Sequence, residues 1–83
     1  MHDHSSDLDP AEAEKLADGS ILSMLLVENL RTPLSEREIV LEHGDEVTVK
    51  DSLARLHGAG LIHRCGEFIF STAAARRASE ILL

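Results

Sequence analysis

The chain has 83 residues, of which 43% are hydrophobic, and it carries a formal net charge of −7. This length predicts a single domain, and the apolar fraction is enough for a small core, which excludes a disordered chain. The single cysteine, Cys65, excludes an internal disulfide and fits a reducing compartment. No apolar run approaches the ~18–20 residues of a membrane span, and the N-terminus lacks the order of a signal peptide. We therefore expect a cytoplasmic protein that does not enter a membrane.

The negative charge is concentrated toward the N-terminus. Residues 1–19 contain six acidic side chains and one basic side chain, whereas residues 47–83 contain five basic and three acidic side chains. Binding to duplex DNA depends heavily on neutralising its phosphates, so the overall charge opposes such binding. The acidity therefore lies mainly in the N-terminal segment, whereas residues 47–83 are weakly basic.

The chain is expected to begin with a disordered acidic tail, residues 1–9, followed by a domain over residues 10–83. Asp9 and Pro10 form a helix-opening pair, with the aspartate as cap and the proline at the first helical position. The run from Asp18 to Ser20 then interrupts the pattern: the helix either kinks and continues, or it ends and Ser20 caps another. Residues 21–30 are the most apolar helical stretch, and we expect them to form the central first helix.

A second helix is predicted after a short extended segment. Residues 31–34 should be extended, because they contain Pro33 and the residue before a proline is pushed toward extended geometry. Ser35 and Glu38 form a capping box, so a helix should follow and end at Gly44. Residues 44–47 are the predicted turn into the next helix.

The third helix and a hairpin are predicted between residues 48 and 70. Thr48 and Asp51 form a second capping signature, and a helix should therefore start at Thr48. Gly58 and Gly60 should end this helix, because glycine accepts left-handed geometry. Residues 61–64 and 67–70 are two β-prone runs on either side of a tight turn at Cys65 and Gly66.

A final helix is predicted from Ala73 to about Leu82. Ser71 and Thr72 can cap it, and its alanines allow close packing against a neighbour. Its apolar side is expected to consist of Ala74, Ala78, Ile81 and Leu82.

One run of residues resembles a known family. Arg55-Leu56, Gly60-Leu61-Ile62 and Arg64 are similar to the join between recognition helix and wing in winged helix-turn-helix DNA-binding domains of small bacterial transcriptional regulators. The similarity extends over roughly residues 20–82. It implies an α+β fold with a three-helix core, a short β-hairpin wing and a C-terminal helix. It also implies binding to double-stranded DNA, a role in transcription regulation, and a homodimer formed through the first or last helix, or both.

The resemblance implies a set of DNA-binding residues on the third helix. Its apolar face should consist of Val49, Leu53 and Leu56, and this leaves the opposite positions outward or flanking. Lys50, Arg55 and His57 would then read the major groove, while Thr48 and Arg64 would hold the DNA backbone. Asp51 departs from this pattern, because a carboxylate repels phosphate unless it accepts from a cytosine amine. The expected DNA-binding residues are Thr48, Lys50, Asp51, Ala54, Arg55, His57 and Arg64.

A second hypothesis is a winged helix that binds proteins and not DNA. The net acidity, the short wing and the position of Asp51 favour it. His57, His63 and Cys65 are the one group of soft metal ligands, but they lack the paired motifs of a structural zinc site, so no metal or other cofactor is expected. No catalytic motif is present, and we do not expect an enzyme.

Overall fold

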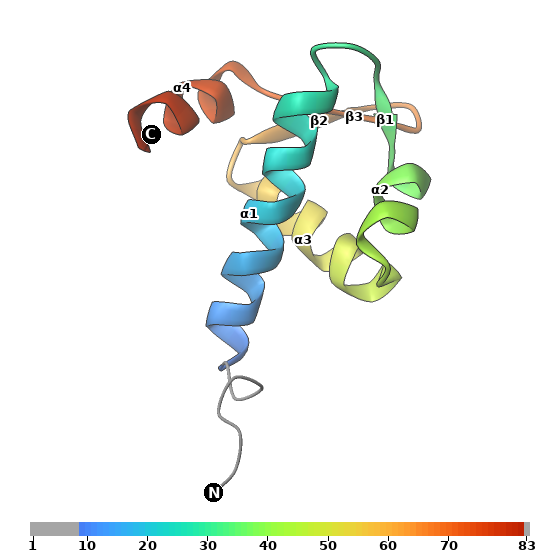
Figure 1. Ribbon diagram of the computed structural model, residues 1–83, viewed down its shortest axis with the longest axis vertical. Helices are drawn as coiled ribbons and strands as arrows, with labels where there is room; N and C mark the ends of the chain where they lie inside the picture. Colours follow the sequence, from blue (N-terminus) through green and yellow to red (C-terminus); the bar gives the residue numbers. More distant parts are fainter. Residues whose placement is uncertain (1–8, 83) are drawn as a thin grey trace, which may run out of the picture.

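The computed structural model describes residues 9–82 and has the α+β organisation that the sequence predicts. Apart from Asp9, the predicted acidic tail lies outside the described residues. Figure 1 shows α1 running through the length of the molecule, with α2 and α3 on one side and α4 on the other. No helix among the described residues is long and apolar enough to span a membrane. The elements are α1 (Pro10–Glu28), β1 (Leu34–Ser35), α2 (Glu36–His43), α3 (Glu46–Gly58), β2 (Ile62–Cys65), β3 (Phe68–Ser71) and α4 (Ala73–Leu82).

Helix α1 begins as predicted and is continuous. Asp9 caps it by accepting a hydrogen bond from the Glu12 backbone N–H, and Pro10 is its first residue. The helix continues through Gly19 to Glu28, so the alternative in which a second helix starts at Ser20 is excluded. Ala17, Ile21 and Leu25 are buried at intervals of four residues, so one apolar stripe crosses the glycine. Burial of this stripe outweighs the ~0.5–1 kcal/mol that a glycine costs inside a helix.

The capping box of α2 is confirmed. The Ser35 hydroxyl accepts from the Glu38 N–H at 3.2 Å, and the Glu38 carboxylate accepts from the Ser35 N–H at 2.9 Å. Gly44 ends the helix with a φ of 98°, in the left-handed region.

Helix α3 starts earlier than predicted. Its first residue is Glu46 and its cap is Asp45, so the predicted start at Thr48 is wrong. The Asp45 carboxylate accepts from the Val47 N–H at 3.2 Å, and the Thr48 hydroxyl donates to it at 2.5 Å. Thr48 therefore supports the cap from inside the first turn, and Asp51 is an exposed residue of the helix.

A three-stranded antiparallel sheet follows the order β1-β3-β2. Leu34 in β1 lies opposite Ile69 in β3, and Arg64 in β2 lies opposite the same residue on the other side. The hairpin is confirmed, but its two-residue turn consists of Gly66 and Glu67, one residue later than predicted. Gly66 has a φ of 62°, which explains why glycine occupies this turn.

The core joins three helices to the sheet. Asn29, just after α1, fastens this helix to β3: its side-chain oxygen accepts from the Ser71 N–H at 2.8 Å, and its amide donates to the Ile69 carbonyl at 3.4 Å. The residues of the main apolar cluster are Ile21, Leu25, Ile39, Val49, Leu53, Leu56, Ile62 and Ile69.

Helix α4 has the predicted bounds but a different inward face. Ala75 is its buried alanine, whereas Ala74 and Ile81, which the sequence placed on the apolar side, are exposed. The orientation of α4 about its own axis follows from the contacts at its start, where the Thr72 hydroxyl accepts from the Ala75 N–H and donates to the Gly60 carbonyl. These contacts turn Ala75 toward the body of the domain.

The two glycines at Gly44 and Gly19 should respond oppositely to alanine. Gly44→Ala should lower the free energy of unfolding by about 1–2 kcal/mol, because φ is positive there. Gly19→Ala should raise it by up to ~1 kcal/mol, because a Cβ at this helical position meets no atom within 4 Å. Urea denaturation of both variants checks this, and destabilisation by Gly19→Ala would contradict it.

Candidate functional site

The sequence-predicted site residues lie on two elements and point in different directions. Lys50, Asp51, Ala54 and His57 are exposed on α3, whereas Thr48 and Arg55 are half-buried. Arg64 is exposed on β2. We call the exposed surface of α3 the α3 face. It consists of Glu46, Val47, Lys50, Asp51, Ala54, His57 and Gly58.

Arg55 is directed toward α1 from the edge of the α3 face, where it lines a small pocket with Thr48 and Asp51. Its Nε and Nη2 donate to the two carboxylate oxygens of Asp18 at 3.0 and 2.8 Å. A second carboxylate, Glu14, lies 3.6 Å from Arg55 Nη1. The fork geometry of guanidinium and carboxylate makes this a directional pair, and it fixes the orientation of the arginine.

Ser52 completes this contact from inside the helix interface. Its side chain is fully buried, and its hydroxyl donates to Asp18 Oδ1 at 2.5 Å. Partial burial raises the pKa of Asp18, but the hydrogen bonds from Arg55 and Ser52, together with the arginine charge, outweigh this and hold the pKa below its ordinary value. The Asp18 cluster of these three residues therefore joins α1 to α3.

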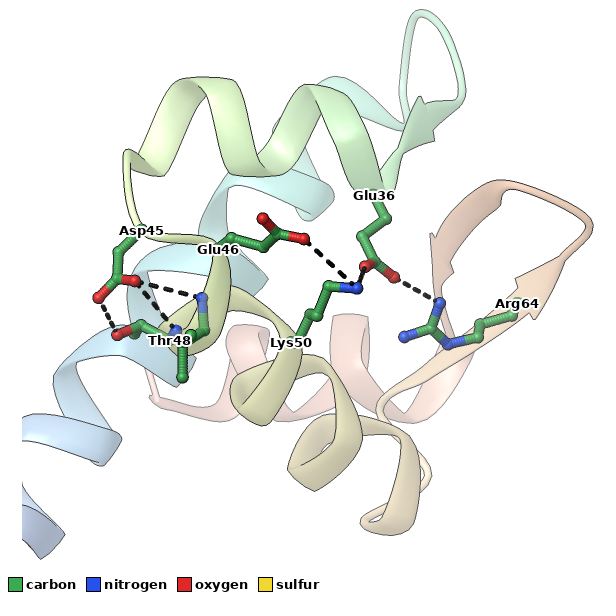
Figure 2. A network of polar contacts seen from close by, with 7 residues as sticks. Glu36, Asp45, Glu46, Thr48, Lys50 and Arg64 are labelled. Atoms are coloured by element: carbon green, nitrogen blue, oxygen red, sulfur yellow. Dashed lines mark hydrogen bonds and ion pairs between the residues drawn. The ribbon is translucent and has the colours of Figure 1, made fainter.

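Lys50 and Arg64 converge on one carboxylate, Glu36, the first residue of α2. Figure 2 shows Glu36 between the two cations. Arg64 Nη1 donates to Glu36 Oε1 at 2.9 Å, and Lys50 Nζ lies 3.5 Å from Glu36 Oε2. Lys50 Nζ is also 3.5 Å from Glu46 Oε2, one helical turn earlier. The Arg64 hydrogen bond is the main reason that the pKa of Glu36 lies below its ordinary range.

The N-terminus of α3 is occupied by a carboxylate of the chain itself. Asp45 accepts from the Thr48 hydroxyl and from the first backbone N–H groups of α3 (Figure 2). The hydrogen bond from Thr48 is the largest cause of the lowered pKa of Asp45. A phosphate at this helix end would have to compete with Asp45 for the same donors.

The α3 face is therefore slightly acidic. It carries two carboxylates, Glu46 and Asp51, against one ammonium group, Lys50. Exposed ion pairs contribute only ~0–1 kcal/mol, so Lys50 and Arg64 can leave Glu36 at little energetic cost. The carboxylates would nevertheless stay beside any phosphate that these cations approached.

Sequence reasoning missed Glu36 and Asp18, the two acidic partners of these cations. Glu36 follows a capping residue, where an acidic side chain is common for helix stability alone. Asp18 is separated from Arg55 by 37 residues, and no local pattern links the two.

The possible metal ligands do not form a cluster. Among residues 9–82, no three His, Cys, Asp or Glu side chains are arranged to hold a metal ion. His63 stacks on Phe70, with ring centroids 5.5 Å apart, and Cys65 is exposed.

Comparisons with known proteins give no match: no family model, curated protein or solved structure is similar enough to place the chain.

Loss of the Asp18 carboxylate should destabilise the fold. Asp18→Ala leaves the buried Ser52 hydroxyl without its acceptor and Arg55 without its fork partner. We expect the free energy of unfolding to fall by about 1–3 kcal/mol, measured by urea denaturation. Glu80→Ala, which removes an exposed carboxylate on α4, is the control and should change stability little.

The effect of Asp18→Ala should depend on pH. A lowered pKa in the folded state means that this carboxylate stabilises the fold above the pKa of the unfolded chain, about 3.9. The stability difference between wild type and variant should be complete above about pH 5 and should shrink as the pH falls further. A difference that stays constant, or grows, toward low pH would contradict this assignment.

Proposed function

We propose that this domain is a winged helix that docks another protein and does not read DNA. The element order supports the winged-helix assignment: three helices enclose the core, α2 and α3 are joined by a short turn at Gly44, and a hairpin follows α3 directly. Strand β1, between α1 and α2, adds a third strand to that hairpin. Winged helices serve both as DNA-binding and as protein-docking modules, so function depends on the exposed surface.

The main support for the proposal is the direction in which the cationic side chains point. Arg55 is held by Asp18 on α1, and Lys50 and Arg64 both meet Glu36. Because binding to duplex DNA depends on cations that meet phosphates, a face whose cations already meet carboxylates is poorly suited to it. The charge of −7 on the whole chain acts in the same direction.

Large apolar side chains are exposed on both helices of the α2–α3 pair. Val47 at the start of α3 is 68% exposed, and Leu41 on α2 is 75% exposed. Single exposed apolar residues are ordinary, but fully buried interface cores favour apolar side chains over charged ones. These residues suit contact with a protein better than contact with phosphates.

The second candidate function is binding of double-stranded DNA by a cytoplasmic bacterial transcriptional regulator. The exposure of Lys50, Ala54 and His57 on one face of α3 favours it, because this is the surface that would enter a major groove. The weak exposed pairs of Lys50 and Arg64 could exchange Glu36 for a phosphate.

We also propose that the chain forms a homodimer through α1 and α4. A largely apolar groove lies between these helices, and Ile81 on α4 is 77% exposed. A second copy would bury surface that the monomer leaves open. The groove is lined by Gly19, Leu22, Ser23, Leu26, Leu61, Ala75, Ala78 and Ser79.

A salt-dependent DNA-binding isotherm tests the main proposal. The wild type should bind genomic duplex fragments no better than random duplex. Glu36→Gln should bind random duplex more tightly and steepen the salt dependence by about one to two phosphate contacts, because it frees Lys50 and Arg64. Glu80→Gln, which makes the same charge change on α4, should leave that slope unchanged. Tight wild-type binding to one genomic fragment, lost in Lys50→Ala, would instead establish the second candidate.

Sedimentation equilibrium tests the homodimer. The wild type should have twice the 9.1 kDa mass of the chain. Ile81→Glu should sediment as a monomer, because it places a charge in the proposed interface, whereas Val47→Glu on the α3 face should remain dimeric. A wild-type monomer at high concentration would exclude this interface.

A further inference from the structure

A groove of about 400 Å³ lies between α1, β1 and α2. This volume falls within the ~300–1,000 Å³ typical of small-molecule pockets, so it can hold one or two large side chains of a partner. Each of the three elements contributes one large apolar residue, and the remaining lining residues are all glutamates. The lining consists of Met24, Leu34, Leu41, Glu28, Glu38 and Glu42.

Helix α2 extends this apolar surface toward solvent. Glu38, Leu41 and Glu42 are three and four residues apart, so they share one face of α2. Leu41 is 75% exposed. A partner that fills the groove would therefore bury this large side chain at its rim.

The charge of the groove is not compensated within its lining. Glu28 is the last residue of α1, and Glu42 lies in the last turn of α2. Helix C-termini carry partial negative charge, so carboxylates are unfavourable there. The Glu38 carboxylate accepts a hydrogen bond from the Ser35 N–H in the capping box. No described residue that lines the groove is a cation. Positive charge from another molecule would relieve this repulsion.

We propose that the groove binds a cationic amphipathic helix of another protein. Its leucine-like side chains would enter between α1 and α2, and its lysines or arginines would meet Glu28 and Glu42. This inference rests on the proposed protein-docking function and adds the site and the chemistry of the partner. A second copy of the chain fits the groove less well, because its net charge is −7. The chain's own residues 1–8 fit it less well for the same reason, since they are also acidic.

The first test uses a fluorescein-labelled helical peptide of about 14 residues, four turns, with a leucine ridge flanked by lysines. One matched peptide replaces lysine with glutamate, and another has the original residues in scrambled order. The basic amphipathic peptide should bind at least about tenfold more tightly than either control, with an affinity that falls as salt is added. Amide chemical-shift changes should centre on α1, β1 and α2.

Two groove variants and one control locate the site. Leu41→Lys and Glu42→Lys should each weaken peptide binding by about tenfold or more, because they place a cation where the peptide brings its own. Glu80→Lys, with the same charge change as Glu42→Lys, should bind as the wild type does. Glu42→Lys should also keep or raise the melting temperature, since it puts a base in a last helical turn. Lost binding with retained stability would exclude unfolding as the cause.

Several results would overturn the inference. No peptide binding, or equal weakening by Glu80→Lys and Glu42→Lys, would leave only general attraction to an acidic chain. Equal binding of a leucyl-lysine dipeptide amide would assign the groove to a small ligand, and self-association abolished by Glu42→Lys would assign it to a second copy. Peptide-induced shift changes centred on the α3 face would exclude the groove as the binding site but would still support protein docking. Specific duplex binding by the wild type would exclude the protein-docking function itself.

Discussion

The arrangement of this domain depends on one polar contact, in which Asp18 accepts three hydrogen bonds from Arg55 and Ser52. It joins the middle of α1 to α3 at the edge of the core, where Asp18 and Arg55 are half-buried and the fully buried Ser52 hydroxyl has its acceptor. A buried polar group without such a partner costs free energy, so the contact specifies how α3 rotates against α1. That rotation directs Arg55 toward α1 and leaves Lys50 as the one lysine or arginine among the exposed residues of α3.

Glu36 has the corresponding role at the other end of the surface. Because it opens α2 beside both α3 and β2, it meets Lys50 and Arg64 together (Figure 2). Neither pair is strong, but together they give the surface a neutral to acidic character. The same helix α2 carries two of the three groove carboxylates, Glu38 and Glu42, and the exposed Leu41. Acidic and apolar side chains are thus combined on the surfaces of α2 and α3, and this combination favours a cationic, partly apolar partner over a polyanion.

Local signals in the sequence account for most of the fold. The Asp9–Pro10 start, the Ser35–Glu38 capping box and the stop at Gly44 depend on neighbouring residues, and all three are present in the structure. The start of α3 is harder to predict from sequence because Asp45 and Thr48 are both good caps, and the choice between them depends on the turn after Gly44. The face of α4 depends on the contact between Thr72 and Gly60, twelve residues away. The orientation of Arg55 depends on Asp18 in another helix, and no local pattern contains that information.

Helix α3 presents an acidic and apolar face, and the cations beside it are paired with carboxylates of the chain. The most direct test of whether this face meets DNA is titration of the ¹⁵N-labelled protein with duplex DNA at low salt, followed through the backbone amides and the side-chain Nε–H of Arg55. The amides of Lys50, Ala54 and His57 should keep their chemical shifts, and the Arg55 Nε–H should stay protected by Asp18. Saturable shifts of these amides on addition of DNA would contradict a protein-docking face.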